Sequence, residues 1–311
     1  MSQVSHYLLL DRISIQQANS ISGPVTYGFP AITGFLGAVH ALNRRLPDTD
    51  LKFSGVLIAC HDCQVRNYRP HPYADYTFNQ SRNPVKKNGN TASIVEEGKV
   101  DLNVTLIIEV SASTKTRREL RDNPTMFVDR CKQAVMMQRI AGGSVHAIEE
   151  VQVFDQSEFS EIRRRLFPAF VLMDARKDLI TITKELQASN PDATAFDALV
   201  ETATIHHHPN HSQSDSGDWR NESIKTGRGW LVPIPVGYQA ISPLFDPGLL
   251  ENSRNPEYPS KYVEALHSLG KWVFPSRLPD EFSDCFWRYS HPSDNLYLAT
   301  QTNDNHQGEE A

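Results

Sequence analysis

The chain has few cysteines, no long apolar run and no excess of basic residues. Its four cysteines are too few and too scattered for a disulfide scaffold, so we expect reduced thiols and a cytoplasmic location. No apolar stretch approaches the roughly 20 residues that a membrane-spanning helix needs. Residues 1–10 also lack the basic start of a secretory signal. These absences predict a protein that neither enters a membrane nor is secreted.

The charge balance of the chain is acidic. Lysine and arginine number 31 against 37 aspartates and glutamates, which gives a net charge of −6. A protein that binds nucleic acid on its own is normally basic overall, so this balance counts against that class. It still allows a subunit that holds a few nucleotides in a local basic pocket while its other surfaces meet protein. Residues 301–311 are an acidic, polar tail that we expect to be disordered.

Motifs for catalysis or metal binding are absent or incomplete. There is no G-x-S-x-G elbow, Walker loop or H-E-x-x-H. Cys60 and Cys63 supply half of a structural zinc site, but the sequence has no second cysteine pair. Completing the site would need a distant histidine cluster, which consists of His206, His207, His208 and His211. We favour a strand that ends in a buried Cys60, and we expect no metal, no cofactor and no catalytic residue.

Hydrophobic periodicity predicts an α+β fold. Strands are expected at residues 6–15, 55–59, 99–110 and 144–153, with helices at 30–46 and 123–141. The order strand, helix, strand, strand, helix, strand is typical of the RRM-like, or ferredoxin-like, unit, here a palm of residues 1–155. Many unrelated proteins share that unit, so the fold alone says little about function.

The connection between the second and third strands, residues 61–98, is far longer than the usual connection of about two to six residues. We interpret it as a protruding hairpin, or thumb, inserted into the palm. The remainder is predicted to form a helical segment at 156–205, a polar linker at 206–226 and a mixed region at 227–300 that completes the fold. Its expected elements are helices at 160–166, 174–186, 194–203 and 262–272 and a strand at 229–238.

The thumb has the composition of a surface that binds unpaired RNA. It interleaves cations with aromatic rings and asparagines, and such rings stack on bases while cations meet phosphates. The residues are Arg66, Arg69, Arg82, Lys86, Lys87, Tyr68, Tyr73, Tyr76, Phe78, Asn79, Asn83, Asn88 and Asn90. An ordinary surface hairpin has a similar composition, so both interpretations remain open. Two glycine loops, at 141–144 and 227–230, allow backbone N–H groups to approach a phosphate, although simple turns explain them equally well.

A series of segments, in order along nearly the whole chain, resembles the second subunit of the Csy complex, the type I-F CRISPR surveillance assembly. The segments are residues 14–22, 28–42, 81–84, 92–98, 139–144, 229–238 and 242–244. The resemblance implies a RAMP-superfamily fold with an RRM-like palm and an inserted thumb. It also implies a non-catalytic partner of the large and backbone subunits that holds the 5′ handle of the CRISPR RNA. Target DNA is then recognised by base pairing to the guide, in antiviral defence.

The matched motifs support the family but do not say which side chains touch RNA. From residue types we predict RNA-binding residues in four regions: the 16–28 loop, the thumb and each of the two glycine loops. Arginine and lysine are assigned to phosphates, asparagine and serine to base edges, and Trp230 to stacking, with core packing as its alternative. The set is Asn19, Ser20, Ser22, Arg82, Asn83, Lys86, Lys87, Asn90, Arg139, Gly142, Gly143, Arg228 and Trp230. The competing hypothesis is a metal-independent repeat-RNA endoribonuclease of the RAMP superfamily, acting through His40 and a tyrosine such as Tyr27.

Overall fold

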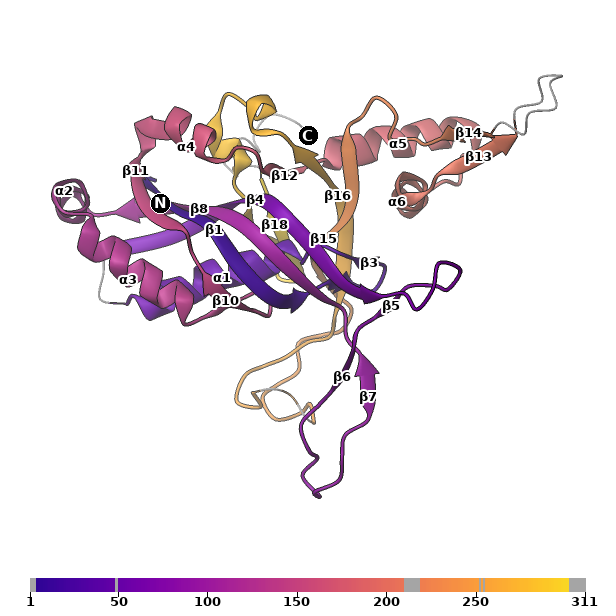
Figure 1. Ribbon diagram of the computed structural model, residues 1–311, viewed down its shortest axis with the longest axis horizontal. Coiled ribbons are helices and arrows are strands. Elements are labelled where there is room, and N and C mark those ends of the chain that lie inside the picture. Colours follow the sequence, from indigo (N-terminus) through magenta and orange to yellow (C-terminus); the bar gives the residue numbers. More distant parts are fainter. Residues whose placement is uncertain (1–3, 48–49, 210–218, 252, 254, 302–311) are drawn as a thin grey trace. The chain divides into compact units, whose positions relative to one another are not determined.

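The computed structural model describes residues 4–47, 50–209, 219–251, 253 and 255–301 (Figure 1). His211 and all of the predicted tail except Gln301 lie outside these residues. The chain divides into two compact units, one of residues 1–171 and 274–288 and the other of residues 172–273 and 289–311. We call them unit 1 and unit 2. Both combine antiparallel strands with helices, which confirms the predicted α+β class.

Unit 1 is built on an antiparallel sheet. The strand order is β12-β4-β8-β1-β10-β9, and β11 also pairs with β1. Its strands are β1 (His6–Asn19), β4 (Leu51–Tyr68), β8 (Lys99–Ala112), β9 (Arg139–Ile140), β10 (Gly143–Ala147), β11 (Glu150–Asp155) and the start of β12 (Phe170–Asp174). Its helices are α1 (Ile32–Arg45), α2 (Thr114–Asp122), α3 (Thr125–Met136) and α4 (Phe159–Arg165). The order β1, α1, β4, β8, α3, β10 agrees with the predicted order of elements.

The core of unit 1 follows from the two periodicities in the sequence. Along β8 every second residue points to the same face of the sheet, and the buried set on that face is Val100, Leu102, Val104, Leu106 and Ile108. Helix α1 contacts β4, and α3 contacts β10 and β11. The stripe that α1 buries has the predicted helical spacing and consists of Ile32, Phe35, Leu36, Val39 and Leu42.

The segment 274–288 returns to unit 1 and packs on the sheet. Tyr7 of β1 stacks on Phe286 with ring centroids 5.2 Å apart and meets Phe282 edge-on at 5.4 Å. The backbones of Trp287 and Val56 exchange two hydrogen bonds of 2.9 Å. Residues from the far end of the chain therefore complete the hydrophobic core that the first strand begins.

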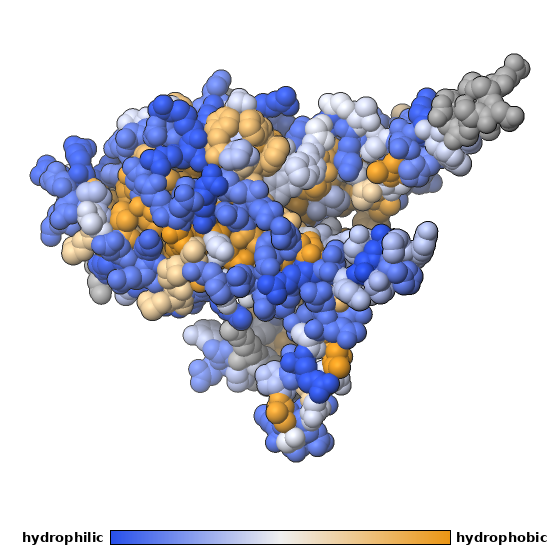
Figure 2. Space-filling model, viewed as in Figure 1, coloured by the Kyte–Doolittle hydropathy of each residue, from blue (hydrophilic) through white to orange (hydrophobic). Residues whose placement is uncertain are grey.

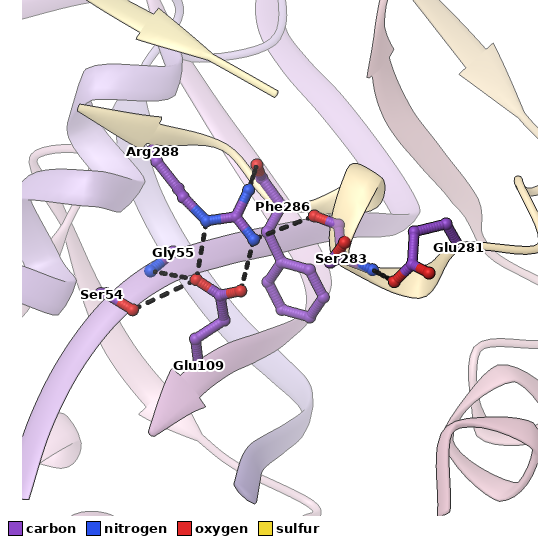
Figure 3. Close-up of polar contacts among 7 residues, drawn as sticks. All are labelled: Ser54, Gly55, Glu109, Glu281, Ser283, Phe286 and Arg288. Carbon is purple, nitrogen blue, oxygen red and sulfur yellow. Dashed lines mark hydrogen bonds and ion pairs between the residues drawn. The ribbon is translucent and has the colours of Figure 1, made fainter. Parts of the chain in front are cut away.

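A buried ion pair joins this returning segment to the central strand (Figure 3). Glu109 on β8 is 2% exposed and forms two contacts with the guanidinium of Arg288, one of them from Nε at 2.9 Å. The same carboxylate accepts hydrogen bonds from Ser54 Oγ at 3.1 Å and from the Gly55 N–H at 3.0 Å. Arg288 also donates to the carbonyl of Ser283 at 2.9 Å. The carboxylate is thus buried with a full set of donors around it.

The insertion leaves the sheet of unit 1 between β4 and β8 as a long projection (Figure 1). It contains the short strands β5 (Thr77–Phe78), β6 (Gln80–Arg82) and β7 (Ile94–Glu96). Strands β6 and β7 pair with each other, and β5 pairs with the end of β4. Because β4 continues through Tyr68, the projection begins at residue 69 rather than at residue 61.

Unit 2 contains an antiparallel sheet of order β17-β18-β15-β16. Its elements are α5 (Arg176–Ser189), α6 (Ala195–Ala203), β13 (His206–Pro209), β14 (Trp219–Glu222), β15 (Trp230–Ala240), β16 (Val263–Val273), β17 (Arg288–Ser293) and β18 (Leu296–Thr300). Helices α5 and α6 pack on each other and on β16 and β15 around one core, formed by Ala175, Leu179, Ile182, Ala198, Leu199, Leu231 and Leu269. The predicted helices at 160–166, 174–186 and 194–203 and the strand at 229–238 are confirmed.

Some predicted elements are wrong. The helix predicted at 262–272 is wrong. Residues 263–273 form strand β16, because pairing with β15 from Trp230↔Trp272 to Ala240↔Val263 outweighs the local helical preference. The predicted linker contains the hairpin of β13 and β14, which pairs His206 with Glu222. The predicted strand at 144–153 is two strands, β10 and β11, that both pair with β1.

The predicted 16–28 loop and the predicted tail also differ from expectation. Strand β1 continues to Asn19, and β2 (Ile21–Gly23) and β3 (Thr26–Tyr27) form a small hairpin after it. Gln301 is buried, and its side chain bonds the backbone of Leu172 and Asp174 at 3.3 and 2.7 Å. Among the helices of the described residues, none is long and apolar enough to cross a membrane.

Candidate nucleic-acid interface

Three segments of the predicted RNA-binding set meet at one end of the sheet in unit 1. The N–H of Asn19, at the end of β1, donates to the carbonyl of Ala141 in the first glycine loop at 2.9 Å. The next N–H, of Ser20, donates to the carbonyl of Gly98 at the base of the insertion at 3.0 Å. The backbone at Asn19 and Ser20 therefore ties the 16–28 segment, the first glycine loop and the insertion into one continuous surface.

The first glycine loop is a two-residue turn between β9 and β10. Ala141 and Gly142 both have positive φ, 49° and 79°, as the favoured two-residue hairpin turns require. Gly143 has no room for a side chain, since a Cβ there would lie 2.6 Å from Cγ2 of Ile15 and 2.8 Å from the N of Ala18. Gly143 thus serves close packing against β1. Gly142 is exposed and leaves its backbone accessible, so it is the glycine of this loop that can approach a ligand.

Arg139 precedes this turn and gives the surface a free cation. It lies on β9 opposite Ser144 of β10 and is exposed. Within the described part of the chain it has no ion pair or hydrogen bond from its guanidinium. An uncompensated arginine beside an open glycine turn suits a phosphate, because the guanidinium provides charge and several donors in a fixed plane.

The side chains on the 16–28 segment are less available than the prediction assumes. Asn19 is exposed, but its amide bonds both the carbonyl and the N–H of Ile21, at 2.8 and 3.2 Å. The hydroxyl of Ser22 bonds that of Thr26 at 2.9 Å. Ser20 is fully buried and its hydroxyl has no partner among the described residues. RNA cannot touch Ser20 in this conformation. To bind RNA, Asn19 and Ser22 would each have to give up an internal hydrogen bond.

The insertion carries exposed cations at a distance from the sheet. Arg82 lies on β6 opposite Ile94 of β7, and Lys86, Lys87 and the predicted asparagines Asn83 and Asn90 follow it. The Lys86 N–H donates to the carbonyl of Asn90 at 3.0 Å, which closes a turn at this point. In the described residues none of the three cations has an ion-pair partner. Figure 2 shows a largely hydrophilic surface over the insertion, interrupted by a few apolar residues.

The base of the insertion is fixed by an ion pair and by ring contacts. Arg66 Nε contacts Asp101 at 2.8 Å, and Asp101 also accepts the Gln17 N–H at 2.9 Å. Burial alone would raise the pKa of Asp101, but these two hydrogen bonds hold it below its ordinary value. Tyr27 of β3 meets Phe78 of β5 edge-on, with centroids 5.6 Å apart. Arg66 is therefore occupied internally, and the sequence alone did not reveal its partner.

The second glycine loop, in unit 2, has a structural explanation for its arginine. Gly227 and Gly229 have positive φ of 80° and 85°. The guanidinium of Arg228 between them donates to the carbonyl of Ile224 at 2.9 Å and to Glu185 of α5 at 2.6 Å. Its charge is thus compensated within unit 2. Trp230 is 55% exposed, so the core-packing alternative for it is wrong, and its ring lies beside that of Trp272 with centroids 6.3 Å apart.

The endoribonuclease and zinc alternatives gain no geometric support. His40 is exposed on α1, and within the described residues no hydrogen bond or ring contact links it to Tyr27. Burial raises the pKa of Cys60 to about 12 and that of Cys63 to about 11. Cys60 is half-buried rather than fully buried, and its Sγ lies 3.4 Å from the Asp62 carbonyl. Over the described part of the chain no group of three or more His, Cys, Asp and Glu residues is arranged to hold a metal ion.

The fold and this surface define an α+β protein that presents free cations and an open glycine turn around a long insertion. Comparison with known proteins agrees with one family. The model of the family described as CRISPR-associated protein (Cas_Csy2) matches residues 8–299. A curated relative, CRISPR-associated protein Csy2 of Pseudomonas aeruginosa, is 35% identical over an alignment of 314 positions that covers 93% of each chain. The chain therefore belongs to the Csy2 family of CRISPR-associated proteins, and the resemblance found in the sequence is confirmed.

Proposed function

We propose that the protein is a non-catalytic subunit of a type I-F CRISPR surveillance complex and holds the 5′ handle of the CRISPR RNA. In that role it pairs with the large subunit, adjoins a backbone subunit and acts in target DNA recognition in the cytoplasm. Membership of the Csy2 family supports a place in such a CRISPR complex. The observation that supports the RNA-holding role is the pair of backbone hydrogen bonds from Asn19 to Ala141 and from Ser20 to Gly98, which join three segments of the predicted set.

The same proposal gives the two parts of unit 1 distinct tasks. The β1, α1, β4, β8, α3, β10 unit is the RRM-like palm of a RAMP-superfamily protein, and residues 69–98 are its thumb. The palm supplies the rigid end of the sheet, with Arg139 and the exposed backbone of Gly142. The thumb supplies the outlying cations Arg82, Lys86 and Lys87. A local basic surface of this kind is compatible with the net charge of −6 for the whole chain.

The structure favours some of the predicted contacts over others. Arg139, Arg82, Lys86 and Lys87 are free to bind phosphates, and the exposed amides of Asn83 and Asn90 can read base edges. Four phosphate contacts on single-stranded RNA predict a slope of about −3 in log affinity against log salt concentration. Ser20 is buried and Arg228 is paired with Glu185, so we assign structural roles to both.

Ultraviolet cross-linking of the assembled particle tests this function. The full chain is co-expressed with a Csy-type large subunit, backbone subunits and a repeat-spacer transcript, and cross-linked peptides are identified by mass spectrometry. We expect cross-links from the 5′ handle to residues 16–28, 82–90 or 139–143. A stable particle without any cross-link to this chain would show that it is a protein adaptor only.

A charge variant with a matched control sharpens the test. Replacing Arg82, Lys86 and Lys87 by glutamine removes three candidate phosphate contacts and should make the salt slope shallower by about 2. The control replaces Lys115, Arg118 and Arg121 by glutamine. These cations lie on α2, which follows the opposite end of β8 from the insertion. Equal effects of the two triple variants would indicate non-specific attraction rather than a handle site.

A further inference from the structure

A buried hydroxyl on strand β8 of unit 1 forms hydrogen bonds with both neighbouring strands. Thr105 is fully buried, and its Oγ1 lies 2.6 Å from Oδ1 of Asp11 on β1. The same oxygen accepts the N–H of Arg12, also on β1, at 3.1 Å. From the other neighbour, β4, Nε2 of His61 approaches it at 2.9 Å. Thr105 therefore links three adjacent strands at one level of the sheet.

The direction of each of these bonds follows from the available protons and lone pairs. A hydroxyl has one proton and two lone pairs, and a carboxylate only accepts, so Thr105 donates to Asp11. The Arg12 N–H occupies one lone pair, and His61 must donate from Nε2 to the other. Nδ1 of His61 then carries a lone pair, and it is buried without a hydrogen-bond partner among the described residues. The hydroxyl of Thr105 thus makes every hydrogen bond of which it is capable.

Both neighbours of β8 are bulged where they meet Thr105. In β1, Asp11 and Arg12 together lie opposite this one residue, and Arg12 has a φ of 46°, which residues other than glycine rarely adopt. In β4 the extra residue is His61. A bulge bends its strand and increases the local twist. Two bulges at one level therefore set the angle between the parts of the sheet on either side.

The bulge in β1 is also the point where this strand changes its partner. Residues 6–11 pair with β11, whereas residues 14–16 pair with β10. The Asp11 carbonyl accepts the Glu149 N–H at 3.1 Å, in the turn between those two partners. Beyond the bulges the sheet carries the candidate nucleic-acid interface, and we call this part the distal half. It consists of residues 14–19, 62–68, 99–104 and 139–147.

We propose that Thr105 is a positioning residue for RNA holding, because its hydroxyl fixes both bulges and thereby the orientation of the distal half. This role rests on the function proposed above. Thr105 is fully buried and cannot touch RNA, so it acts through the placement of Arg139 and the insertion. A methyl group instead of the hydroxyl leaves Asp11, Arg12 and His61 without their shared partner, which frees both bulges.

The affinity for RNA tests this role in a purified complex of the full chain with a Csy-type large subunit. Thr105→Val should weaken binding of labelled 5′-handle RNA by about tenfold, the loss expected if about a tenth of the molecules keep the competent orientation. Thr105→Ser keeps the hydroxyl and should retain the wild-type affinity. The control, Thr202→Val, removes an equally buried hydroxyl that donates to the Ala198 carbonyl of α6 at 2.8 Å, and it should leave binding unchanged.

Hydrogen exchange locates the change without RNA. In Thr105→Val the N–H groups of Asn19 and Ser20 should exchange faster than in the wild type, whereas residues 6–10 and 150–155 should be unaffected. Uniformly faster exchange would overturn the proposal, since it indicates a general loss of stability. Unchanged handle affinity in Thr105→Val would refute the positioning role alone. A wild-type complex that does not bind the handle would refute the proposed function itself, and this role with it.

The protonation of His61 gives a second test, which remains available if Thr105→Val does not fold. The charged groups that face its ring are Asp11 and Arg12 of β1 and Glu149, and Asp62 follows it on β4. Burial, followed by Arg12, holds the pKa of His61 below the ordinary value of 6.5, against the opposite influence of the facing carboxylates. A proton on the buried Nδ1 would lack an acceptor, so the neutral ring is the form that holds Thr105.

The handle affinity of the wild type should therefore decrease as the pH falls below 6.5. His61→Gln keeps a side-chain N–H donor without a titrating ring and should flatten this decrease. The control is His291→Gln, at an exposed histidine of unit 2, and it should keep the wild-type profile. Equal pH profiles of the wild type and His61→Gln would overturn the proposal.

Discussion

Replacing Arg288 by methionine should destabilise unit 1 by about 3 kcal/mol. Removing one partner of a buried ion pair typically costs about 3 to 5 kcal/mol, since the remaining charge is left uncompensated. Glu109 is 2% exposed, which places this pair in the buried class. The carboxylate would still accept hydrogen bonds from Ser54 Oγ and from the Gly55 N–H, at 3.1 and 3.0 Å. These two donors place the expected cost at the lower end of the range.

Denaturant unfolding of the full-length chain measures this loss of stability. Hydrogen exchange at residues 282–288 then reports whether the returning segment opens locally. The control is Arg165→Met, because Arg165 pairs with Glu150 at 2.7 Å and both side chains are more than a third exposed. Exposed pairs contribute below about 1 kcal/mol, so this control should change little.

A double replacement separates the charge from the packing. Glu109→Leu together with Arg288→Met removes both charges and should recover most of the lost stability, because a buried pair replaced by apolar groups is often neutral. A cost of less than about 1 kcal/mol for Arg288→Met, or a double variant less stable than the single one, would contradict a stabilising buried pair.

Three further predictions concern the packing of Gly143, the ionisation of Asp101 and the cleavage of RNA. Gly143→Ala should lower the free energy of unfolding by about 2 kcal/mol or more through its clash with β1, whereas Gly37→Ala, in open space on α1, should raise it by about 0.5 to 1 kcal/mol; chemical denaturation of both variants checks this. The pKa of Asp101 is lowered in the folded state, so its stabilisation is present above the unfolded pKa and is lost as pH falls through the folded pKa. The stability difference between the wild type and Asp101→Asn should therefore shrink below about pH 4, and a persistent difference would contradict the assignment. The purified chain should not cleave labelled repeat RNA without metal, and discrete cleavage abolished by His40→Ala would show that it is an enzyme.

The sequence predicted the elements whose stability is local or whose pattern is strongly periodic. Helix α1 and strand β8 were predicted within one or two residues, because one face of each is uninterrupted by polar side chains. Strand β16 was predicted as a helix, since the run from Tyr262 to Trp272 has good helix formers and lacks clean alternation. Its partner β15 lies more than twenty residues earlier, and a local pattern cannot reveal such a pairing.

For the candidate site, the sequence predicted which residue types could bind RNA but not which of them are available. Chemistry and family could be read from residue types, and the sequence identified Arg139, Gly142 and the thumb cations as candidates. It could not show that Asn19 bonds Ala141 or that Arg228 is held by Glu185, because both contacts join residues far apart in the chain. Burial also removed Ser20 from the accessible surface, although its neighbours in sequence are exposed.

The α+β class, the long insertion and the resemblance to the Csy2 family could be predicted from the amino-acid sequence alone. These properties follow from composition, periodicity and the order of motifs, which each segment carries independently of the rest. The sequence did not predict which cations remain free, which glycines are required for packing, or that the end of β1 meets the insertion and the first glycine loop. Those outcomes depend on strand pairing and on competition among distant side chains for the same partners, and both arise only when the whole chain folds.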